Sequence, residues 1–151
     1  MDEFRNLIEG LAKVSGLPME VDEKNSVTLE YSDFIITLQY LEDPQTIFIY
    51  SPLTGSEMVE NVTEAAMRSA LILSFGGLGT SGNFLGLFDD FLVLSRHVGI
   101  NGLDEEKLSK YIFDFAQNLE SVRNEIVNEV MNTRLSDFDK HADLSSVGLN
   151  V

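Results

Sequence analysis

Three short runs of β-branched and aromatic residues in the first third of the chain constrain the fold more than any other feature. They are Ser26–Tyr31, Phe34–Leu41 and Thr46–Tyr50. Ser32-Asp33 separates the first two runs and suits a two-residue hairpin turn, and Asp43-Pro44 marks the second turn. Residues of this kind favour strands, and short turns join neighbouring strands in opposite directions. The segment therefore predicts three consecutive antiparallel strands.

Helical periodicity lies on both sides of these strands. Apolar residues at spacings of three and four predict an N-terminal helix over about residues 2–14, which Gly16 and Pro18 end. After the third strand, Thr54 and Glu57 fit a capping box, which predicts a second helix from there to about Phe75. The last part of this helix is apolar on nearly every side, so we expect it to be covered by more than one neighbour.

The second half of the chain predicts another hairpin and a long helix. Asn83–Phe88 and Phe91–Val98 have the composition of two strands around an Asp-Asp turn. Asp104 is placed to cap a helix whose apolar residues recur in alternating steps of four and three until about Met131. The periodicity is then lost, and we expect residues 132–151 to form a flexible C-terminal tail.

The order helix, three strands, helix, two strands, helix predicts an α+β fold with helices packed against an antiparallel sheet. A chain of 151 residues has room for one core, so residues 1–131 are expected to form a single domain.

The charge of the chain narrows the choice of partners. Ten Lys and Arg residues stand against 25 Asp and Glu residues, which gives a net charge of −15 and repels both nucleic acid and anionic lipid. The chain starts with acidic residues rather than a secretory signal, and no apolar run approaches the roughly 20 residues of a membrane span. We therefore expect a cytoplasmic protein that binds neither nucleic acid nor membrane.

Residues that carry chemistry are scarce. The chain has no cysteine, and its two histidines, His97 and His141, have no partners at metal-ligand spacing, so we expect no metal site. Gly77–Gly82 has the spacing G-x-G-x-x-G, but it follows a predicted helix and precedes a predicted strand, so it is expected to be a connector without a cofactor. We expect no catalytic residues and no enzyme. Two carboxylates brought together by the fold remain an open alternative.

Apolar residues are the remaining candidates for function, because 44% of the chain is hydrophobic and a small domain has little room to bury them all. One set, on the first helix and the nearby strands, is predicted to bind a partner: Phe4, Leu7, Ile8, Leu11, Val14, Leu29, Ile36 and Leu38. Some of these must be core, since the helix has to cover the sheet. A second set is predicted to form a homodimer interface: Leu71, Phe75, Phe84, Leu85, Leu87, Leu92 and Val93.

This layout, in an acidic chain without cysteine, resembles the class I type III secretion chaperones, the family of the Tir chaperone. The resemblance covers about residues 1–131 and includes Leu7–Ala12, Ser15-Gly16-Leu17 and Thr46–Tyr50. It implies a homodimer in the cytoplasm of a Gram-negative bacterium, without cofactor or nucleotide hydrolysis. Such a protein would bind the N-terminal segment of one or more effector proteins and keep it soluble and competent for secretion.

Under this resemblance the first apolar set becomes the effector-binding surface, and the secretion ATPase is a further candidate partner. One alternative shares the same acidic surface and apolar patches: an adaptor or regulatory subunit outside secretion that binds a partner protein. The sequence does not separate the two.

Overall fold

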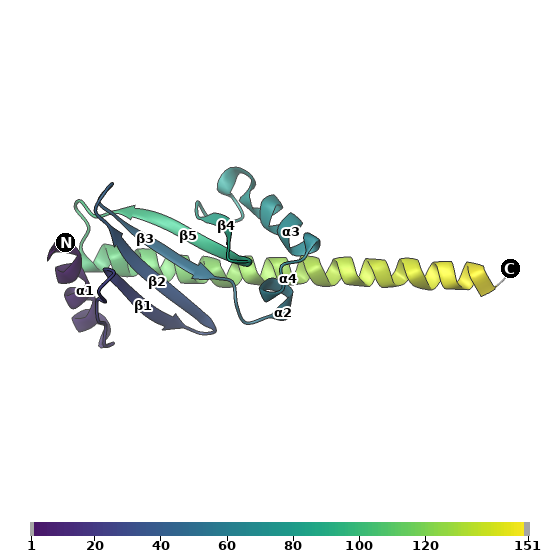
Figure 1. The fold of residues 1–151 in the computed structure, drawn as a ribbon, viewed down its shortest axis with the longest axis horizontal. Coiled ribbons are helices and arrows are strands. Elements are labelled where there is room, and N and C mark those ends of the chain that lie inside the picture. The colour runs from purple at the N-terminus through teal and green to yellow at the C-terminus, as the bar shows by residue number, and fades with distance from the viewer. Residues whose placement is uncertain (1, 150–151) are drawn as a thin grey trace.

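The computed structural model describes the backbone of residues 2–149 and the side chains of residues 2–140. Five strands form one antiparallel sheet in the order β1-β2-β3-β5-β4 (Figure 1). Their bounds are β1 Ser26–Tyr31, β2 Phe34–Leu41, β3 Thr46–Pro52, β4 Phe84–Phe88 and β5 Phe91–Gly99. The five predicted strands and the α+β class are confirmed, and β1 and β4 are the two edges of the sheet.

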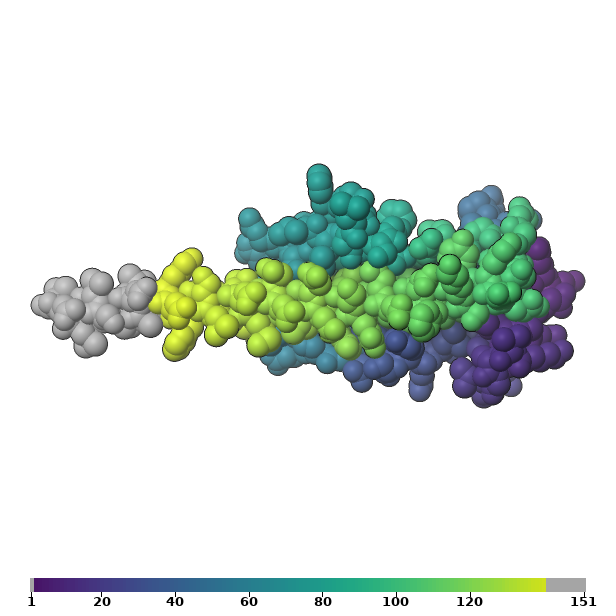
Figure 2. All heavy atoms as spheres, turned by 180° about the vertical axis from the view of Figure 1, so that it is seen from behind, coloured from purple at the N-terminus to yellow at the C-terminus, as the bar shows by residue number. Residues whose placement is uncertain are grey.

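The helices are α1 Asp2–Ser15, α2 Glu57–Glu60, α3 Glu64–Ser74 and α4 Glu105–Leu149, with a short 3-10 turn, η1, at Phe75–Gly77. The long helix α4 runs behind the sheet, and α1 lies beside its first turns, as Figure 2 shows from the back. On β2 every second residue points toward these helices and is buried, which is the alternation expected of a half-covered sheet. Among residues 2–149, no helix covers the other face of the sheet (Figure 1).

The core lies between the covered face of the sheet, α1 and α4. On α4 the buried side chains recur at helical spacing and include Leu108, Phe115, Leu119, Val122 and Ile126, each at most 1% exposed. Asp104 Oδ1 accepts a hydrogen bond of 2.8 Å from the backbone N–H of Lys107, so the predicted cap of this helix is confirmed.

The predicted second helix is divided, and its predicted cap is wrong. Asn61 has extended backbone angles that end α2, and Thr63 then caps α3 by accepting a hydrogen bond of 3.2 Å from the N–H of Ala66. The cap of α2 is Ser56, whereas the Thr54 hydroxyl donates to the carbonyl of Asp33 at 2.6 Å. The sequence offers three hydroxyl residues near this point, and the tertiary contact to Asp33 removes Thr54 from helix capping.

The predicted end of the last helix near Met131 is also wrong, because α4 continues to Leu149 and projects beyond the sheet (Figure 1). Residues 131–140 are all exposed, so the loss of apolar periodicity marks the point where the helix loses its cover. Nothing stops the helix there, since residues 132–147 contain neither proline nor glycine. The expected flexibility of residues 132–151 stays a prediction. Within the described part of the chain, no helix is long and apolar enough to cross a membrane.

Candidate protein-binding surfaces

Most of the first predicted binding set lies in the core. Phe4, Leu7, Ile8, Leu11, Ile36 and Leu38 are each at most 6% exposed. Their burial follows from the direction of α1, whose apolar stripe points inward; the Phe4 ring, for example, stacks on Tyr40 with centroids 5.6 Å apart. A partner cannot touch these six without opening the core. Val14, at 73% exposed, and the half-buried Leu29 are the members that a partner can reach.

Of the accessible members, Val14 lies near the end of α1 and Leu29 lies on β1. Gly16 ends α1 with a positive φ of 70°, and its N–H donates to the carbonyl of Ala12 at 2.9 Å. Leu17 follows and is exposed like Val14.

The outer edge of β1 pairs with no other strand in the described residues. Asp22 occupies the N–H and the carbonyl of Ser26, each at 2.9 Å, so the part of the edge open to an added strand lies beyond Ser26 toward Tyr31.

The second predicted set lies around α3 and the β4–β5 hairpin and is largely exposed. Leu71 is 75% and Phe75 85% exposed, Phe84 and Leu87 are exposed, Leu85 and Val93 are half-buried, and Leu92 is buried. The reason is the way α3 packs, because it turns its small residues Ala66, Ser69 and Ala70 inward. Its large apolar side chains are therefore left outside.

Two apolar hollows lie on either side of this hairpin. The larger, about 570 Å³, lies between the open face of the sheet at Phe48 and Tyr50 and the hairpin at Phe84 and Phe88. The smaller, about 160 Å³, lies between α3 and the other face of the hairpin. Asp89 is the one charged residue along their described linings, so both hollows suit apolar side chains of a protein partner.

The sequence-based set missed several residues of this surface. Ile72, Leu78, Phe88 and Phe91 are all exposed. The signal was available in the sequence, because both strands of the hairpin are apolar on alternate and intervening positions alike, which no two-layer domain can cover on both faces.

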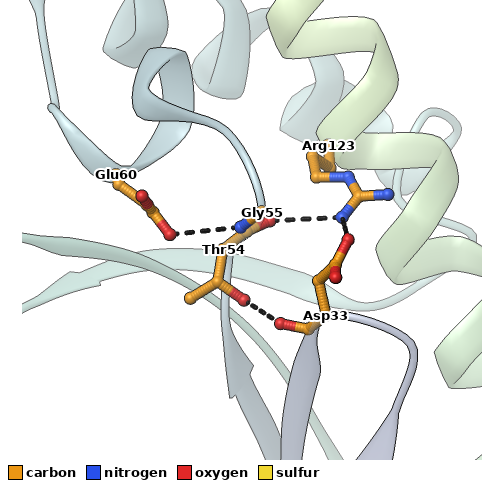
Figure 3. Close-up of polar contacts among 5 residues, drawn as sticks. All are labelled: Asp33, Thr54, Gly55, Glu60 and Arg123. Atoms are coloured by element: carbon orange, nitrogen blue, oxygen red, sulfur yellow. Dashed lines mark hydrogen bonds and ion pairs between the residues drawn. The ribbon is translucent and has the colours of Figure 1, made fainter.

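A polar cluster joins α4 to two turns of the sheet (Figure 3). Arg123 Nη1 donates to Asp33 Oδ2 at 3.4 Å and to the carbonyl of Thr54 at 3.3 Å, and its guanidinium lies 4.5 Å from the centre of the Phe34 ring. Gly55 has a positive φ of 89°, which disfavours a side chain, and a Cβ there would lie 2.5 Å from Arg123 Nη1, so the arginine would have to move. The arrangement holds the β1–β2 turn and the β3–α2 connection in place.

The remaining candidates for chemistry take structural positions. Gly77–Gly82 connects η1 with β4, as predicted, and Gly82 N–H donates back to the Gly77 carbonyl at 2.9 Å. The ring of His97 stacks on Phe48 at 4.7 Å. In the part of the chain where groups are described, no three His, Asp or Glu side chains are placed to hold a metal ion. His141 lies outside the described side chains.

Comparison with solved structures shows the same fold in secretion chaperones. A chain in the structure of the HopA1–SchA chaperone–effector complex has a TM-score of 0.67 and 13% identity, over 81% of this chain and 94% of that one. A chain of the ExsC–ExsE complex has a TM-score of 0.66 and 18% identity, over 80% and 90%. A chain in the structure of the Yersinia pestis type III secretion chaperone SycH in complex with a stable fragment of YscM2 has a TM-score of 0.59 and 13% identity. The match covers 79% of this chain and 98% of that one.

At such identities the likeness concerns the fold alone, and a comparison with curated protein sequences gives no match. The family follows from the sequence profile of the Tir chaperone protein (CesT) family, which matches residues 6–123. The name of this family describes a chaperone. The chain belongs to the Tir chaperone protein (CesT) family, which confirms its resemblance to the class I type III secretion chaperones.

Proposed function

We propose that this protein is a type III secretion chaperone that binds the N-terminal segment of an effector protein and keeps it soluble and competent for secretion. Membership of the Tir chaperone family carries the proposal. The SchA structure is a chaperone–effector complex, and SycH is a type III secretion chaperone bound to a protein fragment. The exposed apolar surfaces of this chain and its open sheet edge suit the same role.

A second copy of the chain is the proposed occupant of the surface formed by α3 and the β4–β5 hairpin. Leu71, Phe75, Phe84 and Leu87 expose large apolar side chains on α3, η1 and β4. Because a two-fold axis brings the same patch of both copies together, one apolar surface is buried twice. Two chains of net charge −15 repel each other, so the contact has to form where the surface is almost free of charge, as it is here.

The effector segment is proposed to pair with the outer edge of β1. An extended chain that adds a strand gains backbone hydrogen bonds, while alternate side chains make the specific contacts. Val14, Leu17 and Leu29 would receive those side chains. Backbone pairing tolerates varied sequences, so the site fits one or more effectors.

The proposal places the protein in the bacterial cytoplasm, with the secretion ATPase as the candidate that receives the complex. In this proposal the effector binds without nucleotide or metal.

Co-purification from the native host tests this function. A tagged chain should capture a protein whose first residues are needed for capture, and removing those residues should abolish it. Leu17→Asp should weaken capture, because it puts a charge where an apolar side chain would sit. Leu135→Asp is the matched control, since Leu135 is equally exposed but lies on the projecting part of α4. Captured proteins that bind through other regions, or equal capture by both variants, would contradict the proposal.

A further inference from the structure

The C-terminal half of β5 has an open edge on the side of β4. β3 pairs with residues Val93 to Gly99 of β5, whereas β4 pairs with β5 only from Phe91 to Ser95 (Figure 1). A turn closed by a hydrogen bond of 2.9 Å from the Asn83 N–H to the Thr80 carbonyl precedes β4, and Arg96–Gly99 has no strand on that side within the described residues. This edge is separate from the β1 edge, at the opposite side of the sheet.

The register shows which backbone groups face this opening. A two-residue turn is closed by a hydrogen-bonded pair, which here is Phe88 and Phe91. Hydrogen-bonded and non-bonded pairs alternate along an antiparallel ladder, so every second residue of β5 after Phe91 directs its N–H and C=O toward β4. Continued past the end of β4, the same alternation directs the backbone groups of His97 and Gly99 into the open edge.

A hollow of about 290 Å³ lies at this edge, and its charged side chains are those of Arg96 and Lys107. It lies between Arg96–Gly99, the loop that follows β5, and the first turns of α4 with Lys107 and Tyr111. No Asp or Glu lines it in the described part of the chain. In a chain of net charge −15, a hollow lined by Arg96 and Lys107 and by no described carboxylate reverses the overall charge.

The two permanent cations of the hollow are held in place but not neutralised. Arg96 lies 5.1 Å from the centre of the Tyr111 ring and donates a long hydrogen bond of 3.5 Å to Asn83 Oδ1. Lys107 Nζ donates to the carbonyl of Gly102 at 3.3 Å. Neither forms an ion pair with any described residue, although Asp114 lines the neighbouring hollow that Arg96 shares. A half-buried, oriented guanidinium without a carboxylate is a ready partner for one.

We propose that this edge is a second docking site, which binds an extended acidic peptide segment as a strand added to β5. The segment would pair with the backbone of His97 and Gly99 in line with β4. A residue opposite Val98 would point its side chain to the same face as Arg96, so a carboxylate there would lie between Arg96 and Lys107. The inference goes beyond the proposed function, because it requires neither the β1 edge nor an identified effector.

Two blocked heptapeptides probe the site, Thr-Val-Glu-Val-Glu-Val-Thr and its version with both glutamates replaced by glutamine. Alternation places both acidic side chains on one face of the added strand. In NMR titrations of the full chain, the acidic peptide should shift the amides of His97 and Gly99 saturably and slow their hydrogen exchange. The glutamine peptide should bind at least about tenfold more weakly, and rising salt should weaken the acidic peptide alone.

Variants separate the site from the general charge of the protein. Lys107→Gln should weaken the acidic peptide about tenfold, whereas Lys110→Gln, one turn away on α4 and outside the hollow, should not. Arg96→Gln should weaken binding of the acidic peptide in the same way. If Arg96→Gln does not fold, Lys107→Gln still tests the site, because Lys107 is exposed and its replacement leaves the core intact. Shifts confined to β1, equal binding of the two peptides, or equal losses in the two lysine variants would overturn the proposal. Failure to capture an effector would leave these results unchanged.

Discussion

Helices α1 and α3 both pack beside α4, yet they bury opposite kinds of residues. α1 turns its large apolar side chains inward, and Leu11 is 3% exposed. α3 buries Ala66, Ser69 and Ala70 and leaves Leu71 and Ile72 outside. A large apolar residue at helical spacing is therefore core in one helix and surface in the other. The difference makes α1 part of the core, whereas α3 carries part of the exposed apolar surface that we propose for association.

The two helices should differ most in their response to a carboxylate placed at a large apolar residue of each. Leu11→Asp should lower the free energy of unfolding by about 4 kcal/mol or more, because it buries an unpaired charge. Leu38→Asp should do the same on the sheet. Leu71→Asp should leave the circular dichroism spectrum intact at concentrations where the wild type is folded. A folded Leu11→Asp variant would show that α1 is not the core helix.

Association tests the other half of the comparison. The wild type should sediment as a dimer of the 16.8 kDa chain at micromolar concentration, and Leu71→Asp and Phe75→Asp should weaken the dimer by about 100-fold or more. Leu135→Asp, equally drastic but on the projecting part of α4, should remain dimeric. A wild-type protein that sediments only at 16.8 kDa would remove the homodimer and with it the proposed role of α3.

Two arginines of α4 allow a second comparison, between a half-buried and an exposed ion pair. The Arg123 side chain is 15% exposed and contacts Asp33, Thr54 and Phe34, whereas the Arg134 side chain is 49% exposed and has one ion pair with Glu57. Arg123→Ala should lower the free energy of unfolding by about 1–2 kcal/mol in urea titrations, through lost hydrogen bonds and ring contact. Arg134→Ala should change it by less than about 0.5 kcal/mol, since exposed ion pairs contribute little. Equal losses would assign Arg123 no special role.

The smallest expected effect concerns the start of α3. Because α3 buries only small residues, its first turn depends more on its cap than that of a helix with a large buried face. Thr63→Ala should destabilise α3 locally by about 1 kcal/mol, seen as faster hydrogen exchange of its amides. Thr133→Ala, at an exposed site within α4, is the control and should leave exchange in α3 unchanged. Unchanged exchange in Thr63→Ala would mean that packing alone fixes α3.

Periodicity in the sequence predicted the elements well but not the direction of their faces. The spacing of Leu7, Leu11 and their neighbours shows that they share a face of a helix, and the same holds for the large residues of α3. Which face meets the sheet depends on what lies opposite, and that is set by tertiary packing. The accessible surface near Val14 was therefore only partly included in the predicted set, and the exposed surface around Leu71 was found because the segment is apolar on all sides.

Contacts between distant residues explain the other errors. The Arg123–Asp33 pair joins residues 90 positions apart, and the same cluster removes Thr54 from the cap that local sequence assigned to it. Local patterns contain no information about such a contact. The extent of α4 shows a related limit, because amphipathic spacing reports burial of a helix, and a helix that leaves the domain loses the spacing without losing its backbone hydrogen bonds.

The projecting end of α4 acts as a spacer. At 1.5 Å per residue, the helical residues 131–149 extend roughly 28 Å from the last buried turn of α4. A fluorophore or an affinity tag attached at the far end of that helix would stand clear of α3, of the β1 edge and of the basic hollow at once. A label joined to the start of α1 would instead lie beside the buried Phe4, so the two ends of the described chain are unequal as points of attachment.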